Sequence, residues 1–250
     1  MTSSDKEQRS ASPNAGRFAT TRWSMVAEAG RHSSPEAAAA LADLCKIYWY
    51  PLYAYVRRQG QSKNDAQDLT QEFFVEILDK GTLQVADRER GRFRSFLLAS
   101  LKNFLTNEWR KGNTQKRGGG RPVISLDFDD GENRYQLEPS HDAPPEKIYE
   151  RQWALTLLER ALTKLRAEFE NTGKTELFQC LKTFVGGDKS AVPYRELGEQ
   201  LNMSEGAVKV AIHRMRKRYR AILRDEIQQT VVAAEDVDEE LRELFNTLAS

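Results

Sequence analysis

The stretch YRELGEQLNMSEGAVKVAIHRMRKRYR, which spans Tyr194–Arg220, predicts two helices joined by a tight turn. Leu197 and Leu201 lie one helical turn apart, as expected for the buried side of the first helix. Ser204 follows the turn and is a favourable N-cap residue for the second helix. The second helix repeats apolar residues at helical spacing, and we expect these to face inward: Val208, Ile212 and Met215. The stretch therefore predicts a helix-turn-helix.

The other faces of the second helix are almost purely basic. We expect no acidic partner four residues away to pair with these basic side chains along the helix. A solvated basic face is one interpretation of such a charge run. The proportions of the helix-turn-helix favour another, in which the second helix lies in the major groove of duplex DNA. The basic residues are Lys209, His213, Arg214, Arg216, Lys217, Arg218 and Arg220.

The chain of 250 residues has a formal net charge of only +1, but its charges are segregated. Basic residues cluster around 102–121 and 205–224, and acidic residues cluster around 65–79 and 235–243. Such local fields matter more for nucleic-acid binding than the total charge does. No apolar run approaches membrane-spanning length and the N-terminus has no apolar signal core, so we expect a cytoplasmic protein without a membrane partner.

The two cysteines, Cys45 and Cys180, both lie in apolar helical contexts. No Cys/His spacing in the sequence is typical of a metal site. We therefore expect two lone, reduced cysteines, no bound metal and no cofactor.

Hydrophobic periodicity predicts an all-α fold of two small helical domains joined by a flexible linker, with the helix-turn-helix in the second domain. We expect a disordered N-terminus over 1–17 and a first domain over 18–111. The segment 112–146 has the glycine and proline content of a linker. The helix-turn-helix domain then covers 147–226, and an acidic amphipathic extension covers 227–250.

In the first domain, a helix predicted over about 64–80 carries an acidic stripe beside its apolar stripe. The acidic stripe is either a solvated face or a docking face for a basic partner, and spacing alone leaves both open. Its residues are Asp65, Asp68, Glu72, Glu76 and Asp79.

The next predicted helix, over about 92–111, is apolar on more than one face and ends among basic residues. Aromatic rings interleaved with cations suit single-stranded nucleic acid, because bases stack on the rings while the cations hold phosphates. Most of these aromatic side chains are expected in the core, whereas Trp109 is expected to be partly exposed.

Taken in order, these features resemble the bacterial RNA polymerase sigma factors of the extracytoplasmic-function (ECF) group, within the sigma-70-like family, over roughly residues 38–226. The family's D-x-x-Q-E pattern corresponds to DLTQE at 68–72. Its R-N-x-x-x-D-x-x-R-K pattern corresponds to KNFLTNEWRK at 102–111, where Asn107 replaces the usual aspartate. A third pattern, S-E-G-T-V-K-x-R-x-H-R-A, corresponds to SEGAVKVAIHRM at 204–215.

The resemblance implies a sigma factor, which is not itself an enzyme. Such a protein binds core RNA polymerase, directs it to specific promoters and supports promoter melting. Docking on the β′ clamp helices would use Asp68, Gln71 and Glu72, and the β subunit of the polymerase is a further expected contact. The expected location is the cytoplasm, with RNA polymerase at the nucleoid.

The resemblance also assigns the two promoter-contacting surfaces. The linker would thread toward the RNA exit path. In the helix-turn-helix, which would meet the distal promoter element, Ala211 replaces a frequent arginine and so removes one phosphate contact. The proximal promoter element would meet Lys102, Asn103, Trp109, Arg110 and Lys111. The distal element would meet Ser204, Lys209, Val210, His213, Arg214, Arg216, Lys217 and Arg218.

Two other classes of protein are alternatives. A stand-alone helix-turn-helix regulator of transcription explains the basic helix but not the acidic helix or the aromatic helix that follows it. An enzyme acting on nucleic acid is disfavoured, because the sequence has no paired carboxylates at a plausible cleft and no metal-ligand cluster. The glycine run at 118–120 lacks the strand and helix that a phosphate-binding loop needs.

The C-terminal extension carries an apolar stripe on an acidic helix. One interpretation is a helix packed on the second domain. Another is an autoinhibitory arm whose acidic face covers the basic recognition helix, anchored by Leu241, Leu244 and Phe245. A separate anti-sigma protein is the other negative regulator that the resemblance leaves open.

Overall fold

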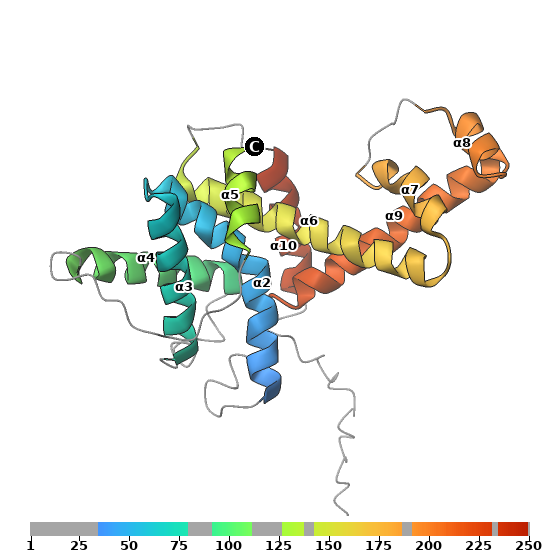
Figure 1. The fold of residues 1–250 in the computed structure, drawn as a ribbon. Helices are drawn as coiled ribbons and strands as arrows, with labels where there is room; N and C mark the ends of the chain where they lie inside the picture. The colour runs from blue at the N-terminus through green and yellow to red at the C-terminus, as the bar shows by residue number, and fades with distance from the viewer. Residues whose placement is uncertain are drawn as a thin grey trace, which may run out of the picture.

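The computed structural model describes residues 35–79, 92–111, 127–137, 143–186, 192–231 and 235–249. Every regular element within these ranges is helical, which confirms the all-α prediction (Figure 1). None of these helices is long and apolar enough to cross a membrane. The predicted disordered N-terminus and the first part of the predicted linker, residues 112–126, lie outside the described residues.

The elements follow in the order α2 (Pro35–Arg58), α3 (Lys63–Asp79), α4 (Phe93–Lys111), α5 (Phe128–Gln136), α6 (Pro145–Asn171), α7 (Thr175–Leu181), η2 (Lys182–Phe184), α8 (Tyr194–Gln200), α9 (Glu205–Gln228) and α10 (Asp236–Ala249). We call α2–α5 the N-terminal lobe and α6–α10 the arm. In Figure 1 the arm extends from the lobe along α6 and α9 and carries α7 and α8 at its far end.

Helix α2 is the centre of the N-terminal lobe, because it presents aromatic side chains on several faces. Tyr48, Tyr50, Tyr53 and Tyr55 are all at most 2% exposed. The ring of Tyr48 meets Phe93 of α4 edge-on, with the ring centroids 5.1 Å apart. Helices α3 and α4 pack on α2 and on each other. The apolar stripes predicted for these helices therefore form the core of the lobe.

Helix α5 lies within the segment predicted as a flexible linker, so this part of the linker is helical instead. Asp127 caps the helix by accepting a hydrogen bond from the Asp130 amide at 3.1 Å. Glu132 anchors α5 to α2, because its carboxylate accepts hydrogen bonds from Tyr53 and from the Arg57 guanidinium, the latter at 3.0 and 3.1 Å. The anchoring partners lie more than seventy residues earlier in the chain, so composition alone did not reveal them.

Helix α6 connects the two parts of the molecule, because it packs on α2 and, as a second contact, on α9. Its Trp153 side chain is fully buried. In the contact with α9, the buried carboxylate of Glu226 accepts a hydrogen bond from Arg160 at 2.9 Å and pairs with Lys164. The expected two modules are therefore packed against each other, in addition to being joined along the chain.

Candidate nucleic-acid interface

Helix α4 presents a polar face on the outside of the N-terminal lobe. Leu101, Phe104 and Leu105 are buried, so residues on the opposite side of the helix face outward. The predicted proximal-element residues whose side chains are described are all exposed: Lys102, Asn103, Trp109 and Arg110. Trp109 is 52% exposed, as its position at the end of the apolar pattern predicted. The side chain of Lys111 lies outside the described residues.

Lys102 is exposed but has partners within the chain. Its ammonium group lies 2.6 Å from a carboxylate oxygen of Glu146, at the start of α6, and 6.0 Å from the ring centroid of Tyr55. The hydrogen bond to Glu146 raises the pKa of Lys102, and the same bond lowers the pKa of Glu146. A DNA phosphate that binds Lys102 therefore has to displace a carboxylate.

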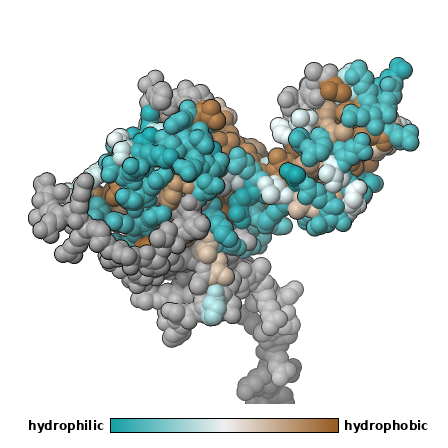
Figure 2. Space-filling view, viewed as in Figure 1, coloured by the Kyte–Doolittle hydropathy of each residue, from teal (hydrophilic) through white to brown (hydrophobic). Residues whose placement is uncertain are grey.

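Helix α3 places the predicted docking residues on one face. Asp68 and Glu72 are exposed, and Gln71 is half-buried beside them. Phe73 and Phe74 are buried on the other side of the helix and hold it against the core. The three predicted docking residues thus lie together at the surface, which is mostly hydrophilic over the visible face of this lobe (Figure 2).

Helices α8 and α9 are joined by a turn that depends on Gly198. A Cβ atom at Gly198 would lie 2.6 Å from the carbonyl oxygen of Met203, so only glycine allows the turn to pass this close to α8. Asn202 has a φ of 53°, a left-handed conformation that asparagine tolerates better than most residues. Ser204 accepts a hydrogen bond from the Ala207 amide at 3.2 Å, which confirms its predicted role as the N-cap.

The first turns of α9 carry an exposed set of side chains at the end of the arm. Val210 is 48% exposed, although it is apolar. Lys209 forms an ion pair with Glu205 at 2.6 Å, so the expectation that no acidic residue pairs along this helix is wrong. The hydrogen bond between them raises the pKa of Lys209 and lowers that of Glu205. The other exposed basic residues predicted for this surface are His213, Arg214, Lys217 and Arg218.

Two of the predicted phosphate contacts are engaged within the arm. Arg216 is half-buried and donates a hydrogen bond to the carbonyl oxygen of Phe184 at 2.8 Å. Arg218 donates two hydrogen bonds to the carboxylate of Glu168 on α6, at 2.8 and 2.5 Å. Both contacts hold α9 against neighbouring segments. Patterns along the sequence did not predict these two contacts, because the partners lie 32 and 50 residues away.

We predict that the adjacent basic residues Lys217 and Arg218 contribute differently to DNA binding, because only Arg218 is held by a contact within the arm. Lys217→Gln should weaken duplex DNA binding by about three- to tenfold, because Lys217 is exposed on α9. The slope of log affinity against log salt concentration should fall by the amount that corresponds to about one phosphate contact. Arg218→Gln is the matched control with the same charge change, and its effect should be smaller because Arg218 already pairs with Glu168. Fluorescence anisotropy across a salt series measures both variants. Equal losses for the two would contradict this division.

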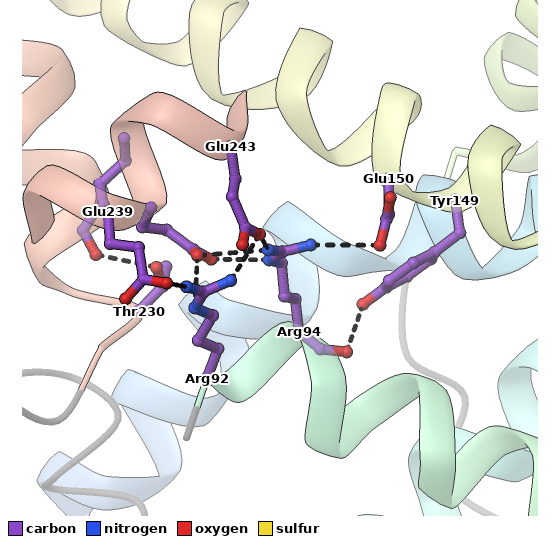
Figure 3. A network of polar contacts seen from close by, with 9 residues as sticks. Arg92, Arg94, Tyr149, Glu150, Thr230, Glu239 and Glu243 are labelled. Atoms are coloured by element: carbon purple, nitrogen blue, oxygen red, sulfur yellow. Dashed lines mark hydrogen bonds and ion pairs between the residues drawn. The ribbon is translucent and has the colours of Figure 1, made fainter. Parts of the chain in front are cut away.

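Sequence reasoning missed a cluster of charges at the first turn of α4 (Figure 3). The buried guanidinium of Arg94 pairs with buried Glu240 of α10 at 2.7 Å, with Glu150 of α6 at 3.4 Å, and also with Glu243 of α10. Arg92 pairs with Glu240 at 2.8 Å, and it also pairs with Glu239 and Glu243. Two arginines beside a helix start and an acidic C-terminal helix were the only signals in the sequence.

The position of α10 corrects the hypothesis that it covers the recognition helix. It packs on α6 and on the C-terminal end of α9, where Asp238 pairs with Arg224. Because a helix rises about 1.5 Å per residue, Arg224 lies roughly 30 Å along α9 from Glu205. Leu244 is fully buried as an anchor, whereas Phe245 is 55% exposed and is not one.

Within the described residues, no group of His, Cys, Asp and Glu has an arrangement that could hold a metal ion. The cysteines are unpaired: Cys45 is buried, which raises the pKa of its thiol to about 12, and Cys180 is half-buried.

Comparison with known proteins identifies relatives of this chain. The family model for sigma-70 region 2 matches residues 49–115, which include the C-terminal part of α2 and all of α3 and α4. The chain is 27% identical over 184 residues to a protein of Mycolicibacterium smegmatis described as the ECF RNA polymerase sigma factor SigE. That alignment covers 73% of this chain and spans 61% of the length of the relative. No solved structure matches the chain.

Proposed function

We propose that this chain, a sigma-70 family protein related to the ECF sigma factors, binds core RNA polymerase, directs it to specific promoters and supports promoter melting. One observation carries the proposal. The region 2 match at 49–115 covers both the acidic face of α3 and the exposed aromatic and basic face of α4. A DNA-binding regulator that acts alone has no use for the first of these surfaces.

The α3 face is the proposed polymerase-binding surface. Asp68 and Glu72 are exposed one turn apart, and Gln71 lies between them. Carboxylates so placed suit a basic partner, because complementary charges steer association and fix the register of the complex. The proposed partner is the β′ clamp helices of the polymerase, with the β subunit as a second contact. The buried aromatic side chains beneath keep this face rigid.

The α4 face is proposed to bind the proximal promoter element while it opens. Trp109 offers an exposed ring on which an unpaired base can stack, and Arg110 beside it offers a cation for a phosphate. Asn103 lies on the same helix with an amide that can hydrogen-bond to a base edge. Stacking of extruded bases on this face would stabilise the melted strand. The chemistry of RNA synthesis belongs to the polymerase.

The exposed part of α9 is proposed to read the distal element as intact duplex. Lys209, His213 and Arg214 can reach base edges or phosphates, and Val210 can contact a thymine methyl group in the major groove. Lys217 lies further along the helix and suits a phosphate. Ser204 keeps its N-cap role and orients the helix start. Arg216 and Arg218 support α9 from within the arm.

Run-off transcription tests the proposal. Purified protein is added to bacterial core RNA polymerase with a library of candidate promoters, and core polymerase alone is the control. We expect transcripts that depend on the added protein and share two sequence elements upstream of their starts. Binding of duplex DNA without co-elution with core polymerase, and without transcripts, would instead establish a stand-alone regulator. In the cell, we expect the protein in the cytoplasm together with RNA polymerase.

A further inference from the structure

The arm places carboxylates on three cations in or directly before α4. Arg92 and Arg94, at the first turn, are bound by acidic residues of α10 and α6, as described above. Two turns further along, Glu146 of α6 binds Lys102. Since α4 is the proposed proximal-element helix, the arm neutralises basic side chains of the helix that has to meet DNA phosphates.

Backbone contacts reinforce this junction between the arm and the N-terminal lobe. The Phe93 amide donates a hydrogen bond to the carbonyl oxygen of Thr230, just after α9, at 3.3 Å. The hydroxyl of Tyr149 donates to the carbonyl oxygen of Arg94 at 2.9 Å. The Arg94 guanidinium also lies over the ring of Trp153, 4.6 Å from its centroid. The first turn of α4 is thus held by α6 and by the segment that leads into α10.

Helix α10 ties this junction to the rest of the arm. Val237 and Leu244 are at most 2% exposed, so the apolar side of α10 is part of the shared core. Asp238 pairs with Arg224 near the C-terminal end of α9. When the α10 carboxylates bind the α4 arginines, they therefore also fix the helix-turn-helix at the far end of α9 relative to α4.

We propose that α10 is an internal clamp: in the free chain it holds the arm closed against α4, and the closed arm competes with promoter DNA for that helix. The inference rests on the proposed function, because it takes α4 as a DNA-contacting helix. Opening the clamp frees Lys102 from Glu146 and lets α4 and the helix-turn-helix move apart. This differs from an arm that covers the recognition helix, since the clamp acts on the proximal surface.

The clamp has outer pairs, which Glu239 and Glu243 form with Arg92, and a buried pair, which Glu240 forms with Arg94. The outer pairs can be weakened without removing the buried pair. The side chains of Glu239 and Glu243 are 57% and 41% exposed, whereas Glu240 is 1% exposed. The hydrogen bond from Arg92 lowers the pKa of Glu243 despite its partial burial, so it is charged at neutral pH. Salt screens partly exposed pairs, so the clamp should also loosen as ionic strength rises.

The test compares two variants with the same charge change. Glu239→Gln with Glu243→Gln removes the outer pairs and leaves Glu240 on Arg94. Glu235→Gln with Asp236→Asn, at the start of α10, is the control, because the ion pairs of Arg92 and Arg94 within the described part of the chain are with other acids. Each full-length protein is titrated against a forked DNA probe that contains a single-stranded segment, without polymerase.

We expect the clamp variant to bind the probe roughly three- to tenfold more tightly than wild type, and the control to change binding less. Spin labels at Ala42→Cys on α2 and Glu176→Cys on α7, with Cys180→Ser, report the distance between lobe and arm. Wild type should give one narrow distance, and the clamp variant a broader distribution.

Equal affinities for the two variants, or identical distance distributions in wild type and the clamp variant, would overturn the clamp. The distance measurement requires neither promoter nor polymerase. Failure of the proposed function would appear differently, as a wild-type protein that neither co-elutes with core polymerase nor supports transcripts.

Discussion

Replacing Asp68 and Glu72 by lysine together is expected to reduce binding to core RNA polymerase by at least about 100-fold, which corresponds to about 2.7 kcal/mol. The double substitution changes the charge of one exposed face of α3 by four units and presents cations to a basic partner. Juxtaposed like charges at an interface cost several kcal/mol. Both side chains are exposed, so the fold should be retained.

The measurement is co-elution with core polymerase, followed by competition against a labelled wild-type chain. Circular dichroism and thermal unfolding check that helix content and stability are unchanged. Asp43→Lys with Asp129→Lys is the matched control, because it makes the same charge change elsewhere on the same lobe, where both acids are accessible. Retained binding by the α3 variant, or an equal loss in the control, would show that the acidic stripe is only a solvated face.

Local patterns in the sequence predicted the elements whose causes are local. The helix-turn-helix is specified within about thirty residues, by the spacing of Leu197 and Leu201, by the close approach at Gly198 and by the cap at Ser204. The spacing of apolar residues along α4 predicted that the Trp109 side chain, near the end of the helix, would be partly exposed. In each of these cases the interacting groups lie within a few turns of one another, so the sequence contains the whole cause.

The features that the sequence did not predict depend on distant partners. Helix α5 is held by Glu132, whose partners on α2 precede it by more than seventy residues. Glu168 on α6 binds Arg218, a contact that the sequence did not predict. The clamp joins Arg94 to Glu240, which are 146 residues apart. Charge patterns identify residues that are able to form ion pairs. Which ion pairs form is determined by the way α6 packs against both parts of the molecule.

The second large effect is expected from Arg94→Ala, which should lower the free energy of unfolding by about 3–5 kcal/mol. Arg94 and Glu240 are 5% and 1% exposed, so the substitution leaves a buried carboxylate with one of its two arginine partners, Arg92. Breaking one side of a buried ion pair is costlier than removing both charges, because the remaining charge stays desolvated. The guanidinium also loses its contact with Trp153.

Chemical denaturation of the full chain measures this effect, with Arg224→Ala as the control, since the pair of Arg224 with Asp238 is exposed and should contribute little. Arg94→Met combined with Glu240→Leu removes both buried charges and should recover much of the lost stability, because the methionine and leucine side chains can fill the same space with apolar atoms. Such recovery would assign the cost of Arg94→Ala to the buried Glu240 carboxylate, which then keeps only Arg92 as a partner. If the double variant were as unstable as Arg94→Ala, packing around Trp153 would be the cause instead. In either case the junction between α4 and the arm would be a structural part of the fold. Deleting α10 outright would therefore destabilise the chain. Neutralising Glu239 and Glu243, by contrast, loosens the clamp and leaves the buried pair of Arg94 and Glu240 in place.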